Sequence, residues 1–529
     1  MTSFEAALPH LADNEELLAN LARAYSAHGR FADALPLLDK VVEIGKASAV
    51  TFADQAVLLE KLGDDAQALK SCNAALARDA GLQLAWTTKA NLLHKAERYD
   101  EALHCHDCLL AMQPDNALAI SARASTLDKL GRMAEALAGH RHAQSLCPGQ
   151  AAIWSGLGVC LVLLDRLEEG LGCFDQALEI DPSHLQAGIN RASVLAELCR
   201  FPESLDQFDA ALHLAPVGSQ AYSQALRYQG MVRLALGNPA GWTGHEHRSF
   251  PDKALDKHSA AAPRWTGAEA LSGKRILLWG EQGYGDIIQF CRYAVSLARL
   301  GATVLLEVPS ALVPLCASLP ATTVHEQSAA VPKHDFQIPM MSMPLASQRH
   351  PQLAPIPCPY GYLRAEPRLV EKWKHSLPRS TRKPRIGITC SGAPHHSRNA
   401  RRSIPLENLL PLTGVAELVV LQPVLMPNDR AVAEARPDIL RPALDISDFS
   451  DVAGLIATLD LVVSVDTSIA HLAGAMGVPV WILLPWNAEW RWETDRADTS
   501  WYESARLFRQ PAPNDWNAVI REVRGALTA

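Results

Sequence analysis

The sequence lacks the features that mark several large classes of protein. No apolar run reaches the roughly 18 residues that a membrane-spanning helix needs, and the opening residues MTSFEAALPHLADNEELL lack the basic segment and apolar core of an export signal. Positive charge is not in excess: 49 Lys and Arg against 57 Asp and Glu give a formal net charge of −8. The chain therefore lacks the excess positive charge that is typical of proteins that bind nucleic acid. We therefore expect a cytoplasmic protein with no membrane span and no nucleic-acid partner.

The cysteines do not form a disulfide framework. There are eleven of them, an odd number, and they are scattered along the chain. This usage indicates reduced thiols, in keeping with a cytoplasmic location. The 48% hydrophobic and 20% charged residues are ordinary for a folded protein, and 529 residues are enough for two to four domains, each with its own core.

The N-terminal half repeats itself every 34 residues. One column gathers residues suited to a turn between helices: Gly29, Gly63, Glu97, Gly131, Asp165 and Cys199. Five positions later a second column holds only small residues: Ala34, Ala68, Ala102, Ala136, Gly170 and Ser204. A third column reads Pro114, Pro148, Pro182 and Pro216. Small side chains let two helices approach closely and a proline ends a helix, so the pattern predicts six helix pairs over residues 13–216.

The period and these columns resemble the tetratricopeptide (TPR) repeat. The resemblance implies a helical solenoid over residues 1–236, with about six repeats and a capping helix. Stacked helix pairs usually bind a peptide or protein segment on their concave face. The alternative is a repeat that only spaces the chain or joins it into a homo-oligomer.

Two runs rich in histidine look like metal sites at first sight. Residues 104–108, HCHDC, fall in the middle of a predicted helix, where neighbouring residues face different directions, and no second ligand pair follows at zinc spacing. We interpret them as ordinary helix. Residues 245–247, HEH, lack the i, i+4 spacing of a zinc-protease helix, and we interpret them as part of a structural linker over residues 237–272.

From about residue 275 the pattern changes to short apolar strands that alternate with helices. The predicted strands are residues 275–280, 303–308, 385–390, 417–422, 460–465 and 478–484, and the predicted helices include residues 287–300 and 452–459. A Pro-rich stretch and the basic PRSTRKPR separate two α/β lobes, which we place at residues 273–375 and 380–529. Two such lobes form a cleft at the carboxyl ends of their strands.

Each lobe carries polar residues where a strand ends. In the first lobe WGEQGYGDIIQF follows a strand, and Gly283 and Gly285 allow the backbone to turn tightly and approach a ligand, while Asp286 lies near a helix start. In the second lobe, Asp466 and Thr467 precede a helix whose N–H groups suit a phosphate. The residues Ser468 and His471 lie in its first turn. For both acidic residues the alternative role is plain helix N-capping.

The C-terminal half, over residues 273–529, resembles the metal-independent GT-B glycosyltransferases of the heptosyltransferase family, glycosyltransferase family 9. The resemblance is carried by GYGDII at residues 283–288 and SVDTSIAHLAGAMGVPV at residues 464–480. With the repeats, the chain is similar to bacterial TPR glycosyltransferases, and its domain order resembles that of protein O-GlcNAc transferases. This implies transfer of a sugar from a nucleotide-diphosphate sugar to a hydroxyl, we expect on Ser or Thr of a protein held by the repeats.

The resemblance also implies roles for individual residues. Asp286 matches the family's catalytic base. The residues expected to bind the donor are Gly283, Gly285, Asp466, Thr467, Ser468 and His471. The run HHSRNARRSIP, residues 395–405, matches the region where a basic side chain meets the donor phosphate. The family typically has a lysine there, and this chain offers Arg401 or Arg402. No Asp-x-Asp pair occurs in this half, so we expect no metal and no cofactor besides the donor.

Five tryptophans lie between residues 483 and 516. We expect most of them to pack the final elements onto the lobes, and Trp486 and Trp490 to contact the donor, with Arg491 nearby. Two alternative functions remain beside the protein-directed transferase. One is a binding scaffold with a degenerate transferase half. The other is a glycan- or lipid-directed transferase in which the repeats only assemble a complex.

Overall fold

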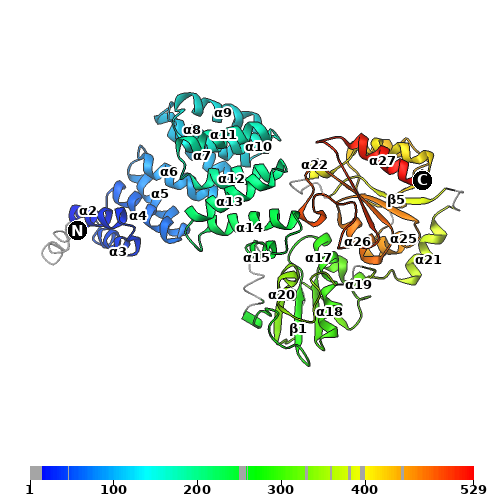
Figure 1. The fold of residues 1–529 in the computed structure, drawn as a ribbon. Helices are drawn as coiled ribbons and strands as arrows, with labels where there is room; N and C mark the ends of the chain where they lie inside the picture. The colour runs from blue at the N-terminus through cyan, green and yellow to red at the C-terminus, as the bar shows by residue number, and fades with distance from the viewer. Residues whose placement is uncertain are drawn as a thin grey trace. The chain divides into compact units, whose positions relative to one another are not determined.

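The computed structural model describes residues 15–45, 47–248, 258, 260–327, 330, 332–357, 360–378, 383–392, 399–442 and 446–529. The chain forms two compact units, residues 1–216 and 217–529 (Figure 1). Within the described residues, no helix combines the length and the apolar character needed to cross a bilayer.

The first unit is an array of helices that pack in consecutive pairs. Each helix has 13 or 14 residues, and the order along the chain is α2 (Glu15–Ala27), α3 (Phe31–Glu43), α4 (Ala49–Leu62), α5 (Asp65–Arg78), α6 (Gln83–Lys95), α7 (Tyr99–Met112), α8 (Ala117–Lys129), α9 (Met133–Leu146), α10 (Ala151–Leu163), α11 (Leu167–Ile180), α12 (Leu185–Glu197) and α13 (Phe201–Leu214). This confirms the predicted helical repeat of the TPR type.

The three sequence columns each have a structural cause. All six turn residues adopt positive φ, from 58° to 86°, which closes the turn between the two helices of a pair. The small residues five positions later are buried where the second helix crosses the first. At Gly170 a Cβ atom would lie 2.8 Å from Val162 Cγ2, so a larger side chain does not fit. The prolines follow α7, α9, α11 and α13 by two residues.

The second unit begins earlier than expected. Helix α14 (Gln220–Ala235) and the short α15 (Gly241–His245) pack against each other, and α14 also contacts the turn η5 (Trp490–Trp492). We had predicted α14 as the cap of a solenoid ending at residue 236. Its contacts place it with the C-terminal unit instead, because it packs on η5 and on α15, whose Trp242 ring meets Trp490 edge to face at 5.2 Å.

The first lobe contains a four-stranded parallel sheet in the order β3-β2-β1-β4. Its strands are β1 (Arg275–Trp279), β2 (Thr303–Val308), β3 (Thr322–Glu326) and β4 (Phe336–Pro339). The helical elements between and after them are α17 (Tyr284–Phe290), α18 (Tyr293–Arg299), η1 (Ser310–Leu312), α19 (Val313–Cys316), η2 (Met340–Ser342), α20 (Met343–Arg349) and α21 (Pro367–Ser376).

The second lobe contains a five-stranded parallel sheet in the order β6-β5-β7-β8-β9. Its strands are β5 (Arg385–Thr389), β6 (Glu417–Val420), β7 (Leu461–Val465), β8 (Val480–Leu484) and β9 (Ala505–Arg509). The helices are α22 (Asn399–Arg402), α23 (Leu406–Leu409), α24 (Pro427–Glu434), α25 (Phe449–Ile456), α26 (Ser468–Met476) and α27 (Trp516–Thr528), with the turns η3 (Leu410–Gly414) and η5. Successive side chains along its strands point to opposite faces of the sheet and pack into two separate apolar cores. Helices therefore cover both faces.

The structure corrects several sequence-based details. Strands β3, β4 and β9 were not predicted. The helix expected over residues 287–300 is two helices, α17 and α18, and at the break between them Arg292 Nε donates to the Gln289 carbonyl at 2.7 Å. Helix α21, which we assigned to the first lobe, packs on α25 of the second. Residues 249–257, 379–382 and 395–398 of the expected linkers and basic run lie outside the described residues.

Candidate functional site

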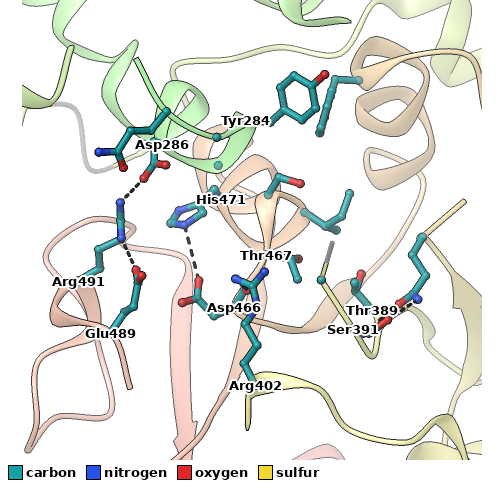
Figure 2. Close-up of a pocket in the computed structure, with 18 of the residues that line it drawn as sticks. Tyr284, Asp286, Thr389, Ser391, Arg402, Asp466, Thr467, His471, Glu489 and Arg491 are labelled. Carbon is teal, nitrogen blue, oxygen red and sulfur yellow. Dashed lines mark hydrogen bonds and ion pairs between the residues drawn. The ribbon is translucent and has the colours of Figure 1, made fainter. Parts of the chain in front are cut away.

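A cavity of about 750 Å³ lies at the carboxyl ends of strands from both sheets of the second unit. The loops after β1, β5, β6 and β7 contribute to its wall, as does η5 after β8. Figure 2 shows that its polar side chains converge on one space from different elements. Of the residues singled out in the sequence, the cavity is lined by Gly283, Gly285, Asp286, Arg402, Asp466, Thr467, Ser468, His471 and Trp490.

Asp286 lies in the first turn of α17 and is not its N-cap. The N-cap is Gly283, which has extended backbone. The Asp286 carboxylate instead forms an ion pair with the guanidinium of Arg491, across the cavity from the other lobe (Figure 2). Its side chain is 19% exposed and so remains open to the cavity. The alternative of simple N-capping is therefore excluded for Asp286.

Arg491 is the cationic centre of this wall. Its side chain is 6% exposed, and it pairs with Glu489 as well as with Asp286. Its Nε donates to Gln289 Oε1 at 2.9 Å, a second contact with α17. Burial alone would lower the pKa of Arg491, but the carboxylates of Glu489, Asp286 and Asp466 outweigh it and raise the pKa. Arg491 therefore stays charged and ties the C-terminal tail to the helix of the candidate base.

The β7–α26 loop presents polar groups without using them as caps. Thr467 is the N-cap residue of α26, yet its side chain makes no cap hydrogen bond and lies 3.1 Å from Ser464 Oγ. Thr467, Ser468 and Ile469 all line the cavity. A helix start with no capping side chain leaves N–H groups that suit an anion. The alternative role of Asp466 as the N-cap of this helix is thus excluded, because Thr467 occupies the N-cap position.

Asp466 and His471 face each other at the base of the cavity (Figure 2). The His471 Nε2 atom lies 3.7 Å from Asp466 Oδ1, and its Nδ1 atom lies 2.8 Å from the Tyr502 hydroxyl. Burial lowers the pKa of His471 well below its usual range, and the cations Arg491, Arg292 and Arg402 add to the effect. Burial and the nearby Glu489 carboxylate raise the pKa of Asp466 to about 6. The imidazole is thus neutral near pH 7.

Of the two candidate arginines, Arg402 lines the cavity and Arg401 does not. Arg402 Nη1 donates to the Asp466 carbonyl at 3.0 Å, while its buried Nε has no partner among the described residues. Gly392 leaves space for this guanidinium, since a Cβ atom there would collide with it. Thr389 and Ser391, at the end of β5, add hydroxyls to the same wall, and Thr389 Oγ1 also lacks a partner in the described part of the chain.

The two glycines of the first lobe have different roles. At Gly285 a Cβ atom would lie 3.0 Å from His471 Cδ2 and 3.5 Å from Ser468 Cα, so glycine lets α17 approach α26 of the other lobe closely. At Gly283 the nearest atom would be Asp286 Oδ2 at an ordinary 3.6 Å. Trp490 lines the cavity as expected, whereas Trp486 is 39% exposed and lies outside the lining.

Sequence reasoning missed one wall of the cavity. The helices α14 and α15 and the residues that follow them contribute Arg227, Met231, His245 and Arg248. His245 is more than a structural connector: it is 5% exposed, lines the cavity, and its Nδ1 has no partner within the described residues. Arg248 donates to Glu281 Oε1 at 2.7 Å and to Ser342 Oγ at 2.7 Å. The run HEH at residues 245–247 is the sequence signal that includes one of them, and we interpreted it as part of a linker because it lacks metal-site spacing.

Both halves of the chain are similar to known proteins. Residues 440–483, which include β7, the loop that follows it and all of α26, match the family model of glycosyltransferase family 9 (heptosyltransferase). The protein FlbA of Caulobacter vibrioides is 27% identical over 323 residues, which cover 56% of this chain and 53% of FlbA. The chain thus spans about half the length of this relative.

Some of the similar solved structures are described as TPR proteins. A tetratricopeptide repeat protein from Parabacteroides merdae is 13% identical, with a TM-score of 0.39, over 46% of this chain and 96% of its own. YrrB, described as a TPR protein with an unusual peptide-binding site, is 21% identical, with a TM-score of 0.30, over 35% of this chain and 95% of its own. The chain thus combines an array of paired helices with a 34-residue period and a second unit in which residues 440–483 match the family model.

Proposed function

We propose that the second unit transfers a glycosyl group from a nucleoside-diphosphate sugar to a hydroxyl of a protein or peptide that the repeats bind. One observation carries the proposal. The cavity brings an acidic side chain of the first lobe, Asp286, opposite a helix start, hydroxyls and an arginine of the second lobe. Transfer from such a donor needs a base on one side of the sugar and an anion site on the other.

The donor diphosphate would bind at the second lobe. The N–H groups at the start of α26 and the hydroxyls of Thr467 and Ser468 can donate hydrogen bonds to it. Arg402, with a buried Nε lacking a partner among the described residues, supplies a positive charge beside the same loop. Its planar fork suits bidentate contact with a phosphate. These groups would stabilise the negative charge that builds on the diphosphate as the bond from the anomeric carbon breaks.

The acceptor would enter on the side of Asp286. The carboxylate accepts the proton of the acceptor hydroxyl as its oxygen attacks the anomeric carbon, and the nucleoside diphosphate leaves from the opposite side. Arg491 holds the Asp286 carboxylate in place through their ion pair before the acceptor binds. His471, neutral and bonded to Tyr502, orients the loop that carries Asp466.

The acceptor class rests on the repeats. A TPR-type array of six helix pairs has a concave face of the kind that binds peptide segments, and this supports a Ser or Thr acceptor on a protein. We propose that the reaction runs in the cytoplasm and needs no metal, because helix N–H groups and arginine can hold the diphosphate that a metal holds in other transferases.

A panel of nucleoside diphosphates and their sugars, tested by thermal shift with and without EDTA, checks the donor site. A ligand present at about 100 times its Kd should stabilise the unit that binds it by roughly 2.7 kcal/mol. The variant Thr467→Ala should lose the shift, and Thr528→Ala, at the exposed end of α27, should keep it. If no ligand of the panel shifts the wild type, the unit does not bind such donors and a binding scaffold becomes the better account.

A further inference from the structure

A second cluster of ionisable side chains lies in the first unit, inside the helical repeats. Asp128 on α8, His140 on α9 and Cys160 on α10 meet at the junction of the fourth and fifth helix pairs. His140 and Cys160 are fully buried, and the Asp128 side chain is 5% exposed. Ionisable groups are seldom buried to this extent unless they are paired or bind a metal.

The repeat itself shows that the fold does not require polar groups here. The residues 34 positions later are Val162, Phe174 and Val194, and the same junction between the fifth and sixth pairs is an apolar core. One repeat earlier the equivalent residues are His94, His106 and Thr126, which include no carboxylate and no thiol. The combination of carboxylate, imidazole and thiol therefore has a cause other than packing.

The geometry matches a tetrahedral metal site. One ligand atom from each of the three side chains lies within 4.8 Å of the others, and His140 Nε2 is 3.2 Å from Asp128 Oδ2. Ligand atoms at zinc distances are about 3.3 Å apart across a tetrahedral edge. Within the described residues, no other group of three His, Cys, Asp or Glu side chains comes together in this way.

The surroundings of the cluster fit the same interpretation. The other ring nitrogen of His140, Nδ1, lies 3.3 Å from Ser121 Oγ, the kind of outer contact that orients a metal-bound histidine. Asp128 Oδ1 is buried and has no partner among the described residues. Gly156 makes room for the imidazole, because a Cβ atom there would lie 3.0 Å from His140 Cε1.

We propose that Asp128, His140 and Cys160 bind one Zn²⁺ ion that joins three helices of two successive repeats. Thiolate, imidazole and carboxylate together are ligands that zinc accepts, and a water molecule can fill the fourth position. The Cys160 thiol releases its proton to solvent when the Zn–S bond forms. The ion stabilises the repeats and has no part in the transfer reaction.

Titration of the full, untagged and reduced chain with Co²⁺ and Zn²⁺ tests the site. We expect one equivalent of Co²⁺ to produce a thiolate-to-cobalt absorption band that Zn²⁺ abolishes, and Zn²⁺ to raise the melting temperature of the repeats. Cys160→Ala should lose the band. The triple variant Asp128→Val, His140→Phe, Cys160→Val copies the next junction and should fold while losing both effects.

His106→Phe is the matched control, since it makes the same exchange one repeat earlier and should leave metal binding unchanged. Absence of the band in the wild type, or an equal band in Cys160→Ala, would show that the three side chains form only a hydrogen-bonded cluster. Neither result bears on the transferase cavity, so the two proposals fail independently.

Discussion

The Arg491 guanidinium forms an ion pair with the carboxylate of Asp286, although 205 residues separate the two in the sequence. Asp286 lies in the first turn of α17 in the first lobe, and Arg491 lies in η5, between β8 and β9 of the second. The pair therefore joins the two sides of the cavity at the candidate base. The sequence left open whether Asp286 caps a helix or serves in the site, and the ion pair shows that its carboxylate contacts the other lobe.

Replacement of Arg491 by Gln should destabilise the second unit. The change removes the cation from between Asp286 and Glu489, whose side chains are only 19% and 28% exposed. Loss of one partner of a largely buried pair leaves an uncompensated charge, and we expect a loss of about 2–3 kcal/mol in the free energy of unfolding measured with urea. The double variant Arg491→Gln, Glu489→Gln should recover part of it. Equal losses in the two variants would mean that Glu489 and Arg491 are not coupled.

Gly285 and Gly283 form a matched pair for testing the contact between the lobes. Gly285→Ala should cost about 1–3 kcal/mol in stability and weaken donor binding, because the new methyl group would press on His471 and Ser468. Gly283→Ala meets nothing closer than 3.6 Å and should keep wild-type stability. Urea unfolding of both variants checks this, and the same loss at the two positions would contradict the close approach of α17 to α26.

Arg402 and Arg401 should differ in their effect on donor affinity. Arg402 lines the cavity beside the Asp466 loop, and removal of a hydrogen bond to a charged phosphate costs about 1.5–3 kcal/mol. Arg402→Ala should therefore raise the Kd of the nucleoside diphosphate at least about tenfold, and Arg401→Ala should change it little. Calorimetric titration of both variants decides the matter. A larger loss in Arg401→Ala would assign the phosphate to the other arginine.

Asp466→Asn should change how stability depends on pH. Because the folded-state pKa of Asp466 is raised from 3.8 to about 6, the folded chain binds more protons than the unfolded chain between those values. This contribution therefore favours folding at pH 4 and is lost as the pH rises towards 7. The asparagine variant lacks it, so its stability relative to wild type should rise by up to about 3 kcal/mol over that range. Urea unfolding at pH 4.5 and 7.5 gives the comparison, and a constant difference would contradict the raised pKa.

The repeats could be predicted almost residue by residue. The turn column from Gly29 to Cys199 adopts left-handed backbone at every position, although three of its six members are not glycine. Periodicity predicts such a structure because each helix pair contacts mainly its neighbours. The buried parallel strands from residue 275 onward were predictable for a similar reason, since each is a short apolar run. The half-buried β3 gives no such signal.

The candidate site could be predicted only in part. The loops after β1 and β7 were identified because polar residues directly follow apolar strands. Arg491 could be placed only near the donor, and its pairing with Asp286 depends on how the chain folds back after β8. His245 and Arg248 could not be found, since α14 and α15 join the second unit through packing against Trp490 and other residues distant in sequence.

The most direct test of the account is the transfer reaction of Asp286→Asn. Wild type and variant would be incubated with the labelled donor identified by thermal shift and with a protein extract as acceptor, while donor affinity is measured in parallel by calorimetry. We expect the wild type to label protein, and Asp286→Asn to bind the donor with similar affinity but label protein about 10²–10⁴ times more slowly. Labelling by the variant at the wild-type rate would show that Asp286 is not the base and would contradict the proposed mechanism.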